Sequence, residues 1–260
     1  MVGVNVAQVQ PKPSAPAQYT GVAVWVPSKL SALKLAQRVD GHIAALRRFE
    51  CEANTVIAMP KRHGQGRMQV VSRVQDGLMY SIQYPGLSFQ RKDEVRKIRV
   101  RADGKVSEIR EPRLKKPLSR PAGQMKIVKQ ASPVDWVTGH PGYIFGAVLG
   151  ETPFTSLVRA ASKPGSGYRL KVSERVIRRL NKPYLQYRLT VLRTGAAAKK
   201  SGAIQLETIV DAARWLPVTV FGAGDFKEKG KEPIRVANSL QWRVRRTPFD
   251  PKMFALRKSS

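Results

Sequence analysis

Side chains that commonly carry chemistry are few in this sequence and are scattered along it. The three histidines, His42, His63 and His140, lack the spacing that places two metal ligands on one helix face. Cys51 is the single cysteine, so neither a structural zinc site nor an intramolecular disulfide is expected. We predict that Cys51 is a small buried apolar residue, because the preceding Arg48-Phe49-Glu50 is too bulky and charged for a lipoprotein signal.

Two glycine-containing segments have a partial similarity to catalytic motifs. Gly165-Ser166-Gly167 lacks the spacing of a nucleophile elbow and is typical of a turn. The segment from Gly195 to Ser201 has some of the residues of a phosphate-binding loop, but Lys200 stands in the place of the second glycine. This segment also lies between two predicted strands, so we predict that it is a solvated hairpin turn.

The acidic residues do not form a pair that could serve as general acid and general base. Many of them lie in predicted turns, namely Asp76, Asp103, Asp225 and Asp250. The sequence therefore predicts a protein that is not an enzyme and that needs no metal or cofactor.

The chain has a large excess of positive charge. Lys and Arg total 47 and Asp and Glu total 18, which gives a formal net charge of +29. Such an excess favours binding to polyanions, and nucleic acid, anionic lipid headgroups and lipopolysaccharide all fit this description. The charge alone does not choose among them.

The N-terminal region differs in composition from the rest of the 260 residues, of which 42% are hydrophobic. Residues 9–18 hold three prolines and little apolar bulk, which is typical of an extended tether. Residues 1–18 also lack the basic segment and the long apolar stretch of an export signal. We interpret residues 1–27 as a flexible, proline-rich segment, either a tether or the remnant of a signal peptide. No apolar run approaches the roughly 20 residues that span a bilayer.

The clearest predicted element is an amphipathic helix over residues 28–49. Ser28 or Ser31 can cap it by accepting hydrogen bonds from first-turn amides. Apolar residues recur every three or four positions along one face, namely Leu35, Val39, Ile43 and Leu46. A helix of this kind must bury its apolar face against another layer.

From Cys51 onward the apolar residues recur at every second position, which is the period of a β-strand. Residues 68–74 and 78–84 alternate in this way, and Asp76-Gly77 between them predicts a hairpin turn. A second Asp-Gly pair at 103–104 predicts another hairpin. The first half of the chain is therefore expected to be a meander of short antiparallel strands.

The second half begins with an apolar, glycine-spaced segment and then returns to strands. Residues 135–157 are the most apolar stretch, with Gly142, Gly146 and Gly150 every fourth residue. Because this stretch is too short to span a membrane, we predict a buried helix or loop. Alternation then returns at 185–191, 204–210, 215–221 (followed by Gly222 and Gly224) and 240–244. Many short strands of this kind predict a sandwich or barrel.

Six short sequence features follow one another in an order that is known from one superfamily. They are the helix Leu30–Phe49, Tyr84-Pro85-Gly86 with Arg91, Ala102-Asp103-Gly104-Lys105, Thr208–Asp211 followed by Trp215-Leu216-Pro217, Val236–Trp242, and Phe249-Asp250-Pro251-Lys252-Met253-Phe254. Over roughly residues 28–256, this order resembles the LolA-like superfamily of bacterial envelope proteins. That superfamily includes a periplasmic lipoprotein carrier, its outer-membrane receptor partner and the RseB-type envelope-stress sensor.

The resemblance implies an α+β fold that is mostly antiparallel β, in a single domain over residues 28–258. Its sheet would be a strongly curved, incomplete β-barrel with helices across the open mouth as a lid. The lid would consist of the helix 28–49 and a short helical segment at 139–150, above a hydrophobic cavity that accepts acyl chains. The side chains expected in this cavity or lid are Leu35, Val39, Ile43, Leu46, Tyr80, Ile82, Tyr84, Phe145, Leu149, Leu185, Tyr187, Leu189, Leu206, Val210 and Trp242.

Three functions remain open on these grounds. The first is non-catalytic binding of lipid acyl chains or lipoproteins by a monomer in the periplasm or another extracytoplasmic compartment, with the basic surface near an anionic membrane or an envelope protein. The second is an envelope-stress sensor of the same fold, which binds a regulatory partner. The third is a basic β protein that binds single-stranded nucleic acid.

Overall fold

The computed structural model gives the fold of most of the chain. It describes residues 23–59, 64–76, 78–85, 94–100, 105–112, 118–124, 133–137, 152–180, 182–226 and 234–255. Phe145, Leu149 and the predicted lid segment 139–150 lie outside these ranges, as do residues 1–22 of the predicted tether.

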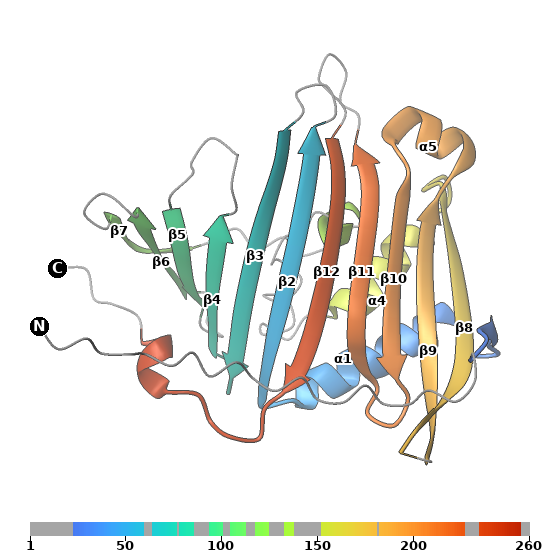
Figure 1. Ribbon diagram of the computed structural model, residues 1–260, viewed down its shortest axis with the longest axis horizontal. Coiled ribbons are helices and arrows are strands. Elements are labelled where there is room, and N and C mark those ends of the chain that lie inside the picture. Colours follow the sequence, from blue (N-terminus) through green and yellow to red (C-terminus); the bar gives the residue numbers. More distant parts are fainter. Residues whose placement is uncertain are drawn as a thin grey trace, which may run out of the picture.

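Twelve strands in these ranges form one antiparallel sheet (Figure 1). The strands are β1 (Val26–Pro27), β2 (Arg48–Met59), β3 (Gly64–Gln75), β4 (Leu78–Pro85), β5 (Glu94–Val100), β6 (Lys105–Pro112), β7 (Leu118–Gln124), β8 (Tyr168–Arg179), β9 (Lys182–Arg193), β10 (Ile204–Asp211), β11 (Leu216–Phe226) and β12 (Ile234–Val244). Their spatial order is β1-β8-β9-β10-β11-β12-β2-β3-β4-β5-β6-β7.

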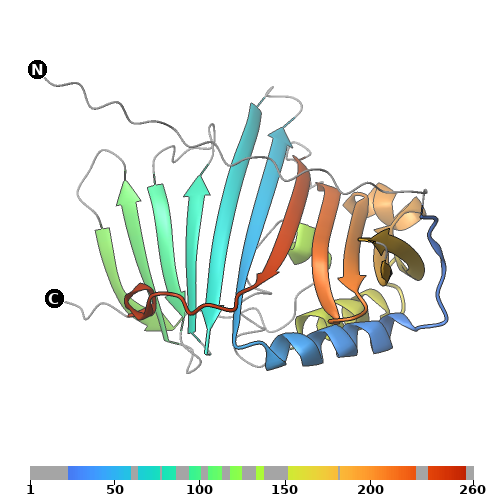
Figure 2. The same cartoon turned by 60° about the horizontal axis from the view of Figure 1, so that its bottom comes forward.

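This order consists of two meanders that meet at a single seam. Strands β2 to β7 follow one another in space as in sequence, and so do β8 to β12. The seam is the antiparallel pair β12–β2, in which Trp242 lies opposite Cys51. The sheet curves and stays open, with β1 and β7 as its two edges (Figure 2). The expected fold class, a mostly antiparallel, curved and incomplete barrel with an N-terminal helix, is confirmed.

The helices cover one face of the sheet over its β8–β12 half (Figure 2). They are α1 (Ala32–Ala45), α2 (Pro133–Val137) and α4 (Pro153–Ala161). We name the face that they cover the inner face and the opposite one the outer face. None of the helices in the described ranges is long and apolar enough to cross a membrane.

Helix α1 forms where its sequence pattern predicts, with shorter bounds. The Ser31 hydroxyl accepts a hydrogen bond from the Lys34 backbone N at 3.3 Å, which caps the first turn. The helix ends at Ala45, because Arg48 already begins β2. Its buried apolar face packs on α4, β8 and β11 and consists of Leu35, Ala36, Val39 and Ile43.

One buried carboxylate joins the two long helices. Asp40, in the middle of α1, accepts hydrogen bonds from the backbone N of Phe154 (3.0 Å) and of Thr155 (2.7 Å). Thr152 at the N-cap of α4 makes no side-chain capping bond, so Asp40 supplies the acceptor that this helix start needs. Burial raises the pKa of the Asp40 carboxyl, although hydrogen bonds from α4 act in the opposite direction.

Helix α2 lies close to the sheet because two glycines leave room for it. A Cβ at Gly222 would lie 3.1 Å from the Cα of Val137, and a Cβ at Gly224 would lie 3.2 Å from its Cγ1. The side-chain amide of Asn238 on β12 donates a hydrogen bond to the backbone carbonyl of Trp136 at 3.1 Å, and this bond also holds α2 against the sheet. Gly222 and Gly224 therefore lie inside β11 and not after it, as the sequence pattern had suggested.

A second, smaller apolar cluster lies on the outer face. It forms where the C-terminal helix η2 (Pro251–Phe254) packs on β4, and its buried members are Tyr80, Phe249 and Phe254. Arg73 borders this cluster: it forms an ion pair with Glu50 at 2.8 Å and lies over the Phe249 ring. The sheet is thus covered on both faces, by different parts of the chain (Figure 2).

The segment Gly195–Ser201 corrects another expectation, since it is a helix, α5, and not a hairpin turn. The buried Arg193 on the preceding strand donates to the carbonyls of Ser201 and Gly202, both at 2.8 Å. These bonds satisfy carbonyl groups at the end of α5 that the helix itself leaves free. An arginine outside the helix therefore completes its C-terminus.

Candidate functional site

Most of the predicted cavity residues meet in one apolar core on the inner face. Six of them are buried in it, namely Leu35, Val39 and Ile43 of α1 and Leu189, Leu206 and Val210 of β9 and β10. Leu46, Tyr187 and Trp242 are partly buried and pack against the same core. The structure thus brings together side chains that α1, β9, β10 and β12 supply from distant parts of the sequence.

The remaining predicted residues do not join this core. Tyr80 and Ile82 belong to the cluster on the outer face, because Met79 is the residue of β4 that faces inward. Leu185 lies near the end of the β8–β9 hairpin and is exposed. The side chain of Tyr84 lies outside the described part of the structure, as do the whole residues Phe145 and Leu149.

A hollow of about 330 Å³ continues the core at the C-terminal end of α1. Two predicted residues, Leu46 and Trp242, contribute to its wall. The other lining residues are Phe49, Asp211, Arg214, Leu216, Pro217, Val218, Arg243 and Val244. We name it the inner hollow, and its size lies in the range of small-ligand pockets, about 300–1,000 Å³.

Trp242, in the apolar part of the inner hollow, has a buried polar atom without a partner among the described residues. The rings of Phe49 and Trp242 stack with centroids 5.2 Å apart. The buried Nε1 of Trp242 has no hydrogen-bond acceptor among the residues that the structure describes. Because buried N–H groups are nearly always paired, this indole N–H is a candidate to donate a hydrogen bond to an oxygen atom of a bound molecule.

The rim of the inner hollow is charged. Arg214 lies 3.5 Å from the carboxylate of Asp211, in the turn between β10 and β11. The next residue, Trp215, stacks on Tyr187 of β9 at 5.5 Å, and the guanidinium of Arg38 of α1 lies 4.5 Å from the centroid of its ring. This stack fixes the turn between α1 and the sheet, so that the charged residues stay at the edge of the apolar wall.

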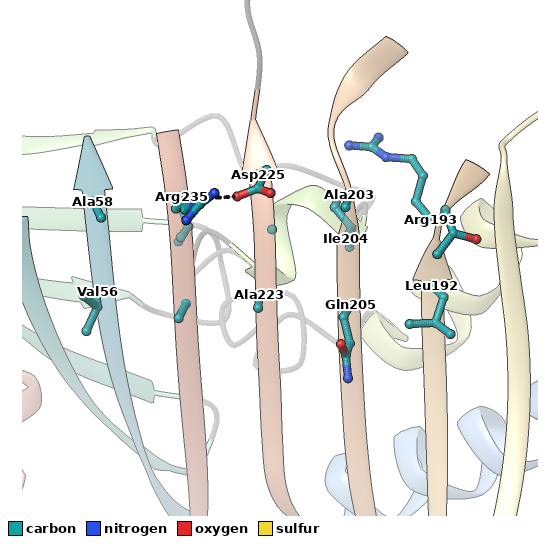
Figure 3. Close-up of a pocket in the computed structure, with 14 residues that line it drawn as sticks. Val56, Ala58, Leu192, Arg193, Ala203, Ile204, Gln205, Ala223, Asp225 and Arg235 are labelled. Atoms are coloured by element: carbon teal, nitrogen blue, oxygen red, sulfur yellow. Dashed lines mark ion pairs between the residues drawn. The ribbon is translucent and has the colours of Figure 1, made fainter. Parts of the chain in front are cut away.

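A second hollow, of about 420 Å³, lies on the outer face (Figure 3). Val56, Ala237, Ala223, Gln205 and Leu192 line it and form one row across five strands, from β2 to β9. The hollow exists because the two alanines in the middle of this row are smaller than their neighbours. At its edge, Arg235 and Asp225 form an ion pair at 3.2 Å (Figure 3).

Neither hollow contains a constellation of groups for catalysis. In the part of the chain that the structure describes, no three His, Cys, Asp or Glu side chains lie close enough to hold a metal ion. The Asp40 carboxylate is committed to the start of α4. The Cys51 thiol is fully buried, as predicted, and burial raises its pKa well above its ordinary value, so that it is a poor nucleophile. These residues hold the fold together.

Sequence reasoning missed several residues of the inner hollow. Asp211 and Arg214 were part of a predicted strand end and turn, and Phe49 was only the last residue of the helical stripe. The Asp-Ala-Ala-Arg-Trp sequence at 211–215 does contain an oppositely charged pair beside a tryptophan, but such a pair alone does not distinguish a binding site from a turn.

Comparisons with known proteins give likenesses of structure only. No protein-family model matches the sequence, and no curated protein does. A DUF1329 family protein from Desulfovibrio piger ATCC 29098 matches with a TM-score of 0.34 and 9% identity, over 86% of this chain and 95% of that one. An outer membrane lipoprotein-sorting protein domain from Vibrio parahaemolyticus matches with a TM-score of 0.32 and 10% identity, over 86% and 97%. At these TM-scores and identities, neither likeness transfers a family or a residue role to this chain.

Proposed function

We propose that this protein binds an acyl chain of a lipid or lipoprotein in the bacterial cell envelope, without catalysis. The observation that carries the proposal is the apolar core on the inner face, which Leu46, Phe49 and Trp242 continue into the otherwise mostly polar inner hollow. An acyl chain buried against these side chains would gain about 0.8 kcal/mol for each methylene group. The head of the same molecule would stay at the rim, beside Arg214 and Arg243.

Trp242 has a defined role in this proposal. Its ring provides apolar surface, and its buried N–H group donates to the carbonyl oxygen of an ester or amide bond that joins the acyl chain to its head. Arg214, which is exposed at the rim, faces the anionic group of the head. No bond is made or broken, so binding and release are the whole reaction.

The proposal is tested with a fluorescent fatty acid and three variants. Wild-type protein should take up the probe. Val218→Arg places a charged side chain across the inner hollow at a position that is already exposed, so uptake should be lost while the thermal midpoint changes little. Trp242→Phe keeps the ring and removes the N–H donor, so affinity should fall about tenfold, as expected for one buried hydrogen bond.

The matched control fills the other hollow. Ala223→Leu occupies space on the outer face and should leave uptake unchanged. If wild-type protein takes up no probe, the proposed function is wrong. If Ala223→Leu abolishes uptake as strongly as Val218→Arg does, the ligand binds elsewhere. Native mass spectrometry of protein purified from bacterial membranes should show a co-purifying acyl lipid.

The net charge of +29 supports nucleic-acid binding as a second candidate. A stacking surface for single strands needs several exposed aromatic rings, and Phe221 is the one aromatic among the exposed large apolar residues of the described chain. This function predicts tight binding to single strands that weakens steeply with salt. Negligible affinity at physiological salt would exclude it.

A further inference from the structure

The β8–β9 hairpin extends beyond the rest of the sheet. The β9–β10 ladder ends at the pair Gln186–Asp211, whereas the β8–β9 ladder continues to the pair Arg179–Lys182. Strand β1 meets β8 only beside Ser173 and Glu174. Residues 176–179 and 182–185 therefore have no other strand beside them, although the Leu185 carbonyl accepts a hydrogen bond from the backbone N of Ala212 in the β10–β11 turn at 3.0 Å. Beyond Leu185, at about 3.3 Å per residue, residues 182–184 project by roughly 10 Å. Figure 1 shows this hairpin reaching past the turn between β10 and β11.

The projecting part, which we name the hairpin tip (residues 176–185), exposes apolar side chains. Val176 and Leu185 lie opposite each other across the hairpin and are 57% and 37% exposed. Leu180, at the turn, is 88% exposed. Single exposed apolar residues are ordinary, but three of them within ten residues of a projecting hairpin form a patch that is typical of an interaction site.

The backbone at Leu180 makes the choice of leucine unusual. Its φ is +48°, a left-handed conformation that two-residue hairpin turns normally fill with asparagine or glycine. Leucine is disfavoured in this conformation, and at 88% exposure it gains no packing that would compensate. A residue that weakens the turn without contributing to the core points to a use outside the fold.

The hairpin tip is also purely cationic. Residues 176–185 contain three Lys or Arg residues and no acidic residue. Arg178 and Lys182 are exposed, and among the described residues no carboxylate forms an ion pair with either. The neighbouring carboxylate, Glu174, accepts a hydrogen bond from the Ser28 hydroxyl. The positive charge of the tip is therefore not neutralised within the described structure.

An aromatic side chain marks the base of the projecting hairpin. The guanidinium groups of Arg175 and Arg188 lie 4.3 Å and 4.6 Å from the ring centroid of Trp25. Val24 and Val26, on either side of Trp25, are exposed. Tryptophan beside arginine is the combination found where proteins meet the headgroup region of a bilayer.

We propose that the hairpin tip docks on the surface of a bilayer that contains anionic phospholipids. Leu180, Val176 and Leu185 would enter the headgroup region, while Arg178 and Lys182 contact lipid phosphates. A nucleic acid could bind the cationic side chains of the tip, but it would leave the apolar side chains exposed to water. Asp211, which lines the inner hollow, lies opposite Gln186 in the β9–β10 ladder, at the base of the tip. Docking would therefore bring the rim of that hollow to the membrane. The inference rests on the hairpin alone and not on the proposed function.

The test measures binding to phosphatidylcholine vesicles with and without phosphatidylglycerol. Wild-type protein should bind the vesicles that contain phosphatidylglycerol, and Leu180→Asn should weaken this binding about tenfold, because a leucine side chain no longer leaves water. Asparagine suits the left-handed turn better than leucine does, so the weaker binding cannot result from unfolding. Equal binding of both proteins would overturn the inference.

A matched charge control separates the tip from the general positive charge. The double variant Arg178→Gln/Lys182→Gln should weaken binding about 25-fold, at roughly fivefold for each cation near the surface. Lys199→Gln/Lys200→Gln removes the same charge from α5, at the other end of β9, and should change binding little. Equal effects of the two double variants, or equal binding to vesicles without phosphatidylglycerol, would overturn the inference. Uptake of the fatty-acid probe by Leu180→Asn should be unchanged, which separates this test from that of the inner hollow.

Discussion

The carboxylate of Asp40 accepts a hydrogen bond from the backbone N of Thr155 at 2.7 Å, so that the middle of one helix caps the start of another. This contact joins helix α1 (residues 32–45) to helix α4 (residues 153–161), which the strand ladders of the sheet do not hold together. It fixes how the two helices lie over the inner face, so the stability of the protein should depend on this contact.

Asp40→Ala should lower the free energy of unfolding by about 2–3 kcal/mol, because two amide N–H groups in a buried position lose their acceptor. Urea denaturation measures this change. The matched control is Asp225→Asn, which breaks an exposed ion pair with Arg235 and should cost less than about 1 kcal/mol. A similar cost for both variants would mean that Asp40 does not cap α4.

The same residue predicts a pH dependence. Burial raises the folded-state pKa of Asp40 above its unfolded value of 3.8, so the folded protein binds a proton more tightly than the unfolded chain. The stability of wild type relative to Asp40→Asn should be greatest below that unfolded value. It should decrease as the pH rises through the raised pKa and stay constant above it. Unfolding free energies of both proteins over an acid pH series measure the difference, and a gap that widens with pH would contradict the prediction.

Gly202→Ala should be strongly destabilising. A Cβ at this position would lie 1.6 Å from the carbonyl oxygen of Asp225, and the residue has a φ of +89°. We expect a loss of more than about 3 kcal/mol, since backbone must move. Gly195→Ala is the matched control, because Gly195 also has a positive φ but has no atom within 4 Å of the added Cβ, so only about 1–2 kcal/mol of backbone strain is expected.

The Cys51 thiol should be unreactive in the folded protein. It is fully buried, and burial, together with the negative charge of Glu50, raises its pKa well above the ordinary value. A disulfide reagent such as Ellman's should therefore react only at the rate at which the protein opens. Adding Ala213→Cys supplies a thiol in the exposed turn after β10, which should react rapidly under the same conditions. Fast reaction of both thiols would show that the core around Cys51 opens readily.

Local periodicity was sufficient to predict α1 and several strands. Leu35, Val39 and Ile43 recur with helical spacing and are the buried residues of α1. Periodicity did not reveal which side chains of a strand point to the inner face when other parts of the chain cover both faces of the sheet. In β4 the even positions look like a core face, yet Leu78, Tyr80 and Ile82 belong to the cluster under η2, while Met79 faces the inner core. The deciding partner is more than 160 residues away, so no local pattern could contain it.

Two local features were missed because contacts outside their own segments accompany them. The last carbonyls of helix α5 accept hydrogen bonds from the guanidinium of Arg193, and Gly222 lies within a strand, where it leaves room for Val137. From sequence alone, a glycine is typical of a turn. The use of a glycine inside this strand becomes clear only when the position of α2 against it is known. The inner hollow is the same case, since its wall combines the end of α1 with the ends of four strands, β2, β10, β11 and β12.

The β12–β2 seam has a consequence for how the chain is made. Strand β2 emerges from the ribosome early, but its partner β12 follows only after more than half of the chain, at about 5–20 residues per second. During that interval β2 presents a free edge of backbone N–H and C=O groups to other nascent chains. Polypeptides truncated before Ile234 would keep that edge open, and we expect them to aggregate although β2–β7 is entire.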